Sequence, residues 1–172
     1  MDAERHRPTP SLRLPSGPAR AHPWIGVVER LAARHRGAFR AHLACLADHD
    51  LYLRFGAHRT PALLDAYVAG IDCTESAVFG VFGDARELVG AAHVGRAGDD
   101  VELGLSVLAS HRRRGIGALL FAAALRHARG AGAQRLCIHA LAENEPMLRL
   151  ARAARVRVRV AAGEAVGQVE IG

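Results

Sequence analysis

The sequence contains no lysine, and all 23 of its basic residues are arginine. A Walker A phosphate loop needs a lysine that reaches the phosphates, and a Schiff base needs a lysine amine, so both chemistries are excluded for this chain. Aromatic residues are only 5% of the chain, so stacking platforms for bases are scarce although the formal net charge is +6. The positive charge therefore suits a small anionic ligand better than nucleic acid.

Cysteine is also scarce, and no histidine motif suggests a metal site in its place. Cys45, Cys73 and Cys137 are widely spaced and form no CxxC pair, so we expect reduced, buried thiols rather than a disulfide framework or a zinc site. The ten histidines include no HExxH motif, and no metal is expected. No apolar run approaches the ~20 residues of a membrane span, and the N-terminus lacks an apolar signal core. We therefore predict a cytoplasmic protein without membrane contact.

The length of 172 residues suits one domain with a single core. Residues 1–23 hold five of the seven prolines, interleaved with arginines, and little that could pack. We expect a flexible tail over 1–23 and a single domain over 24–172. Within that domain, apolar residues at loose helical spacing from Trp24 to about Leu46 predict a helix broken near Gly37. Thr60 and Pro61 are typical of the start of a second helix.

The rest of the chain reads as strands and helices in alternation. Three β-prone runs at 77–82, 88–94 and 101–107 are separated by polar connections at 83–86 and 95–100, which predicts an antiparallel meander. Helical spacing over 115–129 precedes a strand over 135–141. Asn144 can cap a further helix that runs to Ala154, and alternating residues over 155–160 and 166–171 predict two last strands.

The residues most suggestive of chemistry form a segment between the strand that ends at Val107 and the following helix: Arg112, Arg113, Arg114, Gly115, Ile116 and Gly117. Two glycines allow a ligand to approach the backbone, and the first N–H groups of the helix form an anion site. The arginines add donors suited to phosphate, so a diphosphate would fit. By spacing alone, a plain tight turn with solvated arginines fits equally well. Leu120 stands where a dinucleotide-binding fingerprint needs its third glycine.

This segment resembles the coenzyme-binding motif Q/R-x-x-G-x-G/A of the GNAT superfamily of N-acetyltransferases. Asn144, followed by Met147, Leu150 and Ala151, is similar to a second segment of that family. Upstream, Leu51–Phe55 and Gly70–Asp72 are similar to the acetyltransferase domain of bacterial protein lysine acetyltransferases. The resemblance covers roughly residues 36–172. It implies an α/β (α+β) fold with a mixed, mostly antiparallel sheet, splayed between the strands 101–107 and 135–141.

The resemblance also implies a ligand and the residues that bind it. Acetyl-coenzyme A would lie in the splay as cosubstrate, with its pantetheine and thioester along the backbone of Leu105 and Val107. The pyrophosphate would lie at Arg112, Arg113, Arg114, Gly115, Ile116, Gly117 and Ala118. Asn144 would contact the coenzyme arm, and it can serve as a helix cap at the same time.

Glu102 is the candidate general base. Strand alternation places Glu102, Gly104 and Ser106 on one face, where small neighbours leave space for a substrate. A lysine-like amine has an ordinary pKa of ~10.4, so its proton must be removed before or during attack. By resemblance, the lysine acetyltransferase group has its proposed base here, in a pattern that Glu102 and Val107 match. Taken alone, a lone strand glutamate is more often a solvated surface residue.

Other features depart from the family pattern or support other roles. Many family members have a tyrosine as general acid where this chain has Ala151, and Gly-Phe where it has Arg155 and Val156. Cys137 reads as a buried thiol rather than a nucleophile. His111 fits either a phosphate contact or a solvated loop. Tyr52, Arg54 and Phe55 fit either the acceptor side or the core.

Three functions are thus open. The first is transfer of acetyl from acetyl-coenzyme A to a primary amine of a protein lysine or a small molecule, by a monomer or homodimer. The second is a non-catalytic acyl-coenzyme A sensor, which would need the phosphate site but no base. The third is an arginine-rich nucleic-acid binder, whose affinity would fall steeply with salt.

Overall fold

Seven strands form one sheet in the computed structural model, which describes residues 26–171, so the tail predicted for 1–23 lies outside the described residues. The strand order is β1-β2-β3-β4-β5-β7-β6. Every neighbouring pair is antiparallel except β4 and β5, which confirms the mixed, mostly antiparallel sheet. The strands are Val28–Leu31 (β1), Ser76–Phe82 (β2), Leu88–Ala97 (β3), Asp100–Val107 (β4), Arg135–Leu141 (β5), Arg157–Ala161 (β6) and Glu164–Glu170 (β7).

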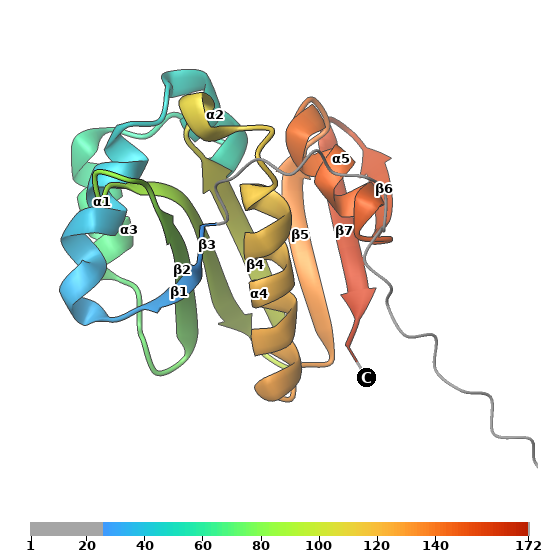
Figure 1. The fold of residues 1–172 in the computed structure, drawn as a ribbon. Coiled ribbons are helices and arrows are strands. Elements are labelled where there is room, and N and C mark those ends of the chain that lie inside the picture. Colours follow the sequence, from blue (N-terminus) through green and yellow to red (C-terminus); the bar gives the residue numbers. More distant parts are fainter. Residues whose placement is uncertain (1–25, 172) are drawn as a thin grey trace, which may run out of the picture.

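Helices cover both faces of this sheet (Figure 1). One apolar cluster joins α1, α2 and α3 to β1, β2 and β3. A second cluster joins α4 and α5 to the central strands. The helices are Arg36–Ala44 (α1), Asp48–Phe55 (α2), Pro61–Ala69 (α3), Ile116–Gly130 (α4) and Glu145–Ala153 (α5), with short 3-10 turns at Ala33–His35 (η1) and Ala109–His111 (η2). Between residues 26 and 171, no helix is long and apolar enough to cross a membrane.

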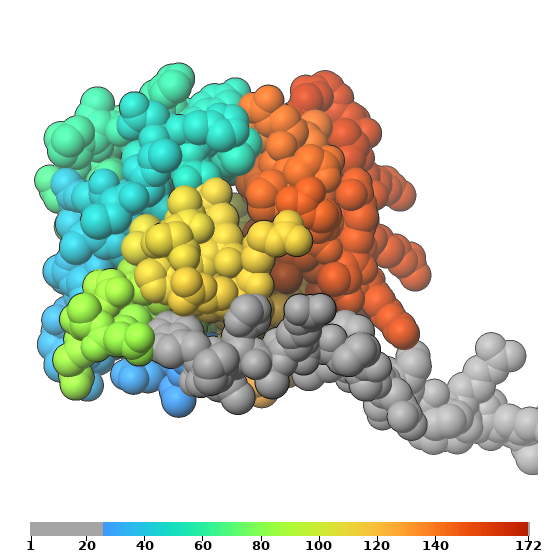
Figure 2. Space-filling model, turned by 45° about the horizontal axis from the view of Figure 1, so that its top comes forward, coloured from blue at the N-terminus to red at the C-terminus, as the bar shows by residue number. Residues whose placement is uncertain are grey.

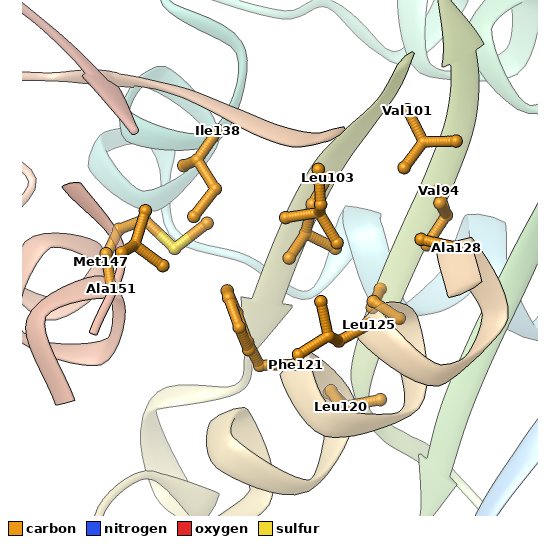
Figure 3. Close-up of a cluster of buried hydrophobic side chains, with 14 of the residues drawn as sticks. Val94, Val101, Leu103, Leu120, Phe121, Leu125, Ala128, Ile138, Met147 and Ala151 are labelled. Carbon is orange, nitrogen blue, oxygen red and sulfur yellow. The ribbon is translucent and has the colours of Figure 1, made fainter. Parts of the chain in front are cut away.

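The core beneath α4 links the two halves of the sheet. Leu120 and Phe121 of α4 are almost fully buried, and Leu103 of β4 and Ile138 of β5 belong to the same cluster (Figure 3). Met147 of α5 belongs to this cluster as well. Burying side chains of this kind is worth about 1.5–3 kcal/mol each. The same contacts therefore hold α4 and α5, whose N-termini form the site, in fixed positions.

The sequence interpretation was wrong at the start of the domain. The helix expected from Trp24 to about Leu46 is instead strand β1 followed by α1, and Gly37 lies within α1 rather than at a break. β1 pairs with β2 in register Val28↔Val81, a long-range pairing that local spacing does not encode. A separate helix, α2, occupies residues for which no helix was specified.

Three further expectations need correction. The connection expected over 95–100 is a two-residue turn, because β3 runs on to Ala97 and Gly98 adopts a φ of 66°. Cys45 and Cys73 are exposed rather than buried, and only Cys137 is buried; all three are free. The last two strands begin at 157 and 164 rather than at 155 and 166, and they end at 161 and 170 rather than at 160 and 171.

The structure explains how the chain accommodates Arg155 and Val156 after α5. Arg155 adopts a left-handed φ of 59°, where glycine is usual, and Val156 donates its N–H to Ala151 O at 3.0 Å. Val156 then turns into the core above Gly167, where an added Cβ would come within 3.0 Å of its Cγ1. Val156 thus fills the core position where many family members have phenylalanine, and Arg155 takes the strained backbone conformation where they have glycine.

Strands β4 and β5 separate soon after they meet. They pair only at Val101↔Leu136 and Glu102↔Cys137, although both strands continue for several residues. α2 contacts both strands at this end of the sheet (Figure 1). The sheet is therefore splayed where the resemblance predicts a coenzyme.

Candidate active site

The N-terminus of α4 is open and carries no side-chain cap. Gly115 precedes the helix with a φ of 83°, a conformation that few other residues adopt, and a Cβ added there would meet no atom within 4 Å. The first recorded bond of the helix runs from Leu119 N–H to Gly115 O at 3.1 Å. The amides of Ile116, Gly117 and Ala118 precede it, so the positive end of the helix is available to an anion.

The three arginines before this helix have different surroundings. The Arg112 guanidinium forms an ion pair with Asp50 of α2 at 2.7 Å and donates from Nε to Val107 O at 3.1 Å, so it braces the loop against β4 and α2. Arg114 donates to Ser110 O at 3.3 Å. Arg113 is exposed, with a left-handed φ of 61° that bends the chain into the turn. Of the three, Arg113 is the best placed to meet a phosphate.

The backbone of β4 offers hydrogen-bonding groups to the splay. Leu108 donates its N–H to Val89 O of β3 at 2.9 Å. Successive backbone groups of a strand point to opposite sides, so the N–H groups of Val107 and Leu105 point toward β5. β5 has already separated at this level, which leaves these groups facing the gap. The predicted role of Leu105 and Val107 thus has a geometric basis.

A cavity of about 590 Å³ connects these features. Its lining includes Leu105, Val107, Arg112, Arg113, Gly115, Ile116, Gly117, Asn144 and Leu150, whereas Arg114 and Ala118 lie outside it. Figure 2 shows one depression in the surface, around which three parts of the chain meet: α2, α5 and the segment that precedes α4. We call it the coenzyme-side cavity.

Asn144 connects two walls of this cavity. Its side-chain oxygen accepts from Met147 N–H at 3.2 Å, so it caps α5 as predicted. Its amide donates to Leu53 O of α2 at 3.2 Å. In this structure Asn144 thus holds α2 against α5, and sequence spacing gave no sign of the second bond.

A second cavity of about 430 Å³ adjoins the first, because Leu53 and Arg54 line both. Glu102 and Gly104 of β4 form part of its floor, with His93 of β3 beside them. Glu102 is exposed, and among residues 26–171 its side chain has no recorded hydrogen bond or ion pair. We call this the acceptor-side cavity. The structure thus brings Glu102 near the splay, while the helix N-terminus lies in the other cavity.

Arg54, which the sequence offered for the acceptor side, belongs to a polar cluster in the acceptor-side cavity, and sequence reasoning missed the other members, Tyr67 and His93. Arg54 donates to the Tyr67 hydroxyl at 3.2 Å, and that hydroxyl lies 2.7 Å from Nδ1 of His93. Burial, with a smaller contribution from the nearby charge of Arg54, lowers the pKa of His93 to about 4, so the ring is neutral near pH 7. No local pattern in the sequence indicated His93; in the structure, strand pairing places it opposite Gly104.

A buried histidine on α1 forms a second unpredicted contact. Nδ1 of His42 lies 2.8 Å from Leu88 O, which can only accept, so Nδ1 carries the proton. Nε2 of His42 therefore accepts from the Ser106 hydroxyl at 2.9 Å. Burial lowers the pKa of His42 to about 4. This contact fixes Ser106, which lines the coenzyme-side cavity, against α1.

Two other candidates of the sequence analysis have structural roles or local contacts. Cys137 is buried in β5, and burial raises the pKa of its thiol, which does not suit a nucleophile. His111 lines the coenzyme-side cavity, and its Nδ1 lies 2.9 Å from the Ser110 hydroxyl. Among the described residues, no group of three or more histidine, cysteine or acidic side chains is arranged to hold a metal ion.

The sequence model of the Acetyltransferase (GNAT) family matches residues 55–154, which is more than half of the chain. The chain belongs to this family. The match includes Glu102, the open helix N-terminus and Asn144, so it spans the central part of both cavities. A comparison with curated protein sequences gave no match.

Solved structures of acetyltransferases share the fold of this GNAT protein. The GNAT domain of a PAT protein from S. lividans is 18% identical, with a TM-score of 0.74 over 83% of this chain and 89% of that one. An N-acetyltransferase from Staphylococcus aureus Mu50 is 14% identical, with a TM-score of 0.68 over 87% and 100% of the two chains. A phosphinothricin acetyltransferase from Sinorhizobium meliloti, solved with acetyl-coenzyme A, is 12% identical, with a TM-score of 0.68 over 86% and 89%.

Membership makes this protein an acetyltransferase that uses acetyl-coenzyme A as cosubstrate. The described residues fit that ligand, because the uncapped helix N-terminus and the open space at Gly115 suit a pyrophosphate. No observation favours the sensor alternative. The family leaves the acceptor open.

Proposed function

We propose that this GNAT protein transfers acetyl directly to a primary amine, either a protein lysine or a small-molecule amine, in a ternary complex without a covalent enzyme intermediate. The observation that carries the proposal is the pair of adjoining cavities on either side of Leu53 and Arg54. One contains the open N-terminus of α4, which suits an anion, and the other contains the unpaired carboxylate of Glu102. A thioester and an amine can therefore enter from different sides and meet at the splay.

The coenzyme supplies the activated acetyl group. Its pyrophosphate would bind at the amides of Gly117 and its neighbours, and its pantetheine would follow the backbone of Leu105 and Val107. An N–H group that points into the splay can also donate to the thioester oxygen, where negative charge develops in the transition state.

Glu102 is proposed to accept the proton of the amine. The amine nitrogen attacks the thioester carbon, the carbon–sulfur bond breaks, and one amine proton passes to the carboxylate. The departing thiolate takes up a proton, so the products are an amide and the free thiol of coenzyme A. Ala151 stands where many family members have a tyrosine acid, and its buried methyl cannot donate this proton. Solvent or the released amine proton would serve instead.

Replacement of Glu102 by glutamine tests the base, because Gln keeps the size and polarity but cannot accept the proton at neutral pH. We expect kcat/KM to fall by ~10²–10⁴, the usual span for general base catalysis, with coenzyme affinity unchanged. Glu164→Gln is the matched control, since Glu164 is an exposed carboxylate of β7 that also lines this cavity. Its activity should stay within a few-fold of the wild type.

The pH profile provides a second readout. The wild type should show an acidic limb that reports loss of the carboxyl proton, and Glu102→Gln should lack it. Equal rates and the same limb in both proteins would remove Glu102 from the mechanism and leave the acetyl transfer itself intact.

A further inference from the structure

Two arginines of the acceptor-side cavity share one aromatic ring. The guanidinium carbons of Arg54 and Arg59 each lie 4.9 Å from the centroid of Phe55, so they are at most twice that distance apart. Arg54 comes from the last turn of α2, and Arg59 from the loop before α3. Both line the acceptor-side cavity and both are partly buried.

Neither guanidinium has an acidic partner among residues 26–171. The recorded ion pairs involve other arginines, and the carboxylates of Glu102 and Glu164 in the same cavity are not among them. Nε of Arg59 is buried and has no hydrogen-bond partner. A buried donor without a partner lowers stability, and more so when it belongs to a charged group.

The ring of Phe55 and the Tyr67 hydroxyl compensate only in part for the missing acidic partners of the two arginines. A cation over an aromatic face gains only a modest electrostatic attraction, and Arg54 adds one hydrogen bond to Tyr67. The charge of Arg54 also acts on its surroundings, since it contributes to the lowered pKa of both His42 and His93. The cavity therefore keeps a local excess of positive charge beside an unused donor.

A carboxylate is the group that this arrangement lacks. Guanidinium groups bind carboxylates through parallel N–H···O bonds, and one carboxylate has enough acceptor sites for two arginines. The Arg54 guanidinium lies over Gly104, because a Cβ added to Gly104 would overlap it. Gly104 and Glu102 are two positions apart on the same face of β4, a spacing of roughly 7 Å. An anion at the arginines and an amine near Glu102 would thus lie within the length of one small molecule.

We propose that the acceptor is an amine that also carries a carboxylate, and that Arg54 and Arg59 bind this carboxylate. This inference rests on the proposed function of the same site. The carboxylate satisfies Nε of Arg59 and offsets the paired charges, and the amine is thereby held toward the thioester. A free amino acid and a peptide with an acidic residue beside the acceptor lysine both present this chemistry.

Matched acceptors test the inference directly. Initial rates of coenzyme A release are measured for 6-aminohexanoate against pentylamine and for lysine against cadaverine, pairs that differ only in the carboxylate. A third pair of N-acetylated peptides has Lys-Glu in one and Lys-Gln in the other. We expect the carboxylate to raise kcat/KM by about tenfold or more, since charge-assisted hydrogen bonds contribute about 1.5–3 kcal/mol. The pair with the larger ratio identifies the source.

Variants of Arg59 show whether this arginine pair causes the preference. Arg59→Gln should reduce the ratio within each pair toward one, mainly through a higher acceptor KM, and Arg59→Lys should restore part of it. Arg126→Gln, which removes an exposed arginine of α4 far from the cavity lining, should keep the wild-type ratio. Melting temperatures of all variants establish that they are folded.

The outcomes separate this inference from the proposed function. Transfer to amines with no carboxylate preference in the wild type would overturn the inference and leave the acetyltransferase proposal standing. An unchanged ratio in Arg59→Gln would remove Arg59 from recognition. No transfer to any acceptor would overturn the proposed function and this inference together.

Discussion

The stability of this protein is expected to fall as the pH drops from about 7 toward 4, and His42 should account for much of the fall. His42 is only 2% exposed, and burial lowers its pKa to about 4 from an ordinary value of 6.5. Its Nε2 accepts from Ser106 and therefore has no room for a second proton. Below pH 6.5 the imidazole of His42 becomes protonated in the unfolded chain, whereas in the folded chain it stays neutral down to about pH 4.

The size of the effect follows from the two pKa values. One pKa unit corresponds to about 1.4 kcal/mol, and the loss accumulates only where the unfolded form is protonated and the folded form is not. We obtain a loss of about 2 kcal/mol at pH 5 and about 3 kcal/mol at pH 4, relative to the stability above pH 7. Stability is thus retained above the unfolded pKa and is lost as pH falls toward the folded one.

Urea denaturation of wild type and His42→Gln at several pH values between 5 and 7.5 measures this difference. Glutamine has a donor and an acceptor for Leu88 and Ser106 but no titrating group. The variant is expected to be less stable at pH 7.5, and its free energy of unfolding should fall by about 2 kcal/mol less than that of the wild type down to pH 5. His49→Gln, at an exposed position of α2, should keep the wild-type slope. Parallel curves for wild type and His42→Gln would refute the reasoning.

Two predictions concern the coenzyme-side cavity. Gly117→Asp should weaken acetyl-coenzyme A binding by about 1–4 kcal/mol in calorimetry, because a carboxylate would face the pyrophosphate. Gly117→Ala should bind almost normally, since its Cβ would lie 3.6 Å from Leu150, an ordinary contact; equal affinities of the Asp and Ala variants would contradict the phosphate-site assignment. Asn144→Ala should lower the free energy of unfolding by about 1 kcal/mol or more through the lost cap of α5. Asn144→Ser can still cap the helix and, like the Ala variant, loses the bond to Leu53, so equal melting temperatures for the two would show that the cap contributes nothing.

Much of the fold could be predicted because its signals are local. The strand 135–141 and the strands of the meander follow from β-prone runs between turn residues, and Thr60 caps α3 where its spacing with Pro61 indicates. The start of the domain failed because β1 has only four residues and is defined by its partner β2. A pattern of apolar residues does not distinguish such a strand from a loose helix.

The candidate site was predictable to different depths. The sequence by itself predicted an open helix start at Gly115–Gly117, because the first N–H groups of a helix have no partner within it, and the binding of an anion there stays a prediction. It also placed Glu102 on the face of β4 opposite the core, because alternation along a strand is fixed by the pleat. These features are properties of neighbouring residues.

Only the tertiary structure decided how residues far apart in the chain share one cavity. Asp50 forms an ion pair with Arg112, and Asn144 donates a hydrogen bond to Leu53. The guanidiniums of Arg54 and Arg59 both contact the ring of Phe55. None of these contacts has a signature in the local sequence. The splay itself depends on where β5 leaves β4, and both strands share one core cluster with α4 and α5. Contacts between residues far apart in the sequence depend on burial and charge in the folded chain, because only folding brings their side chains within reach of one another.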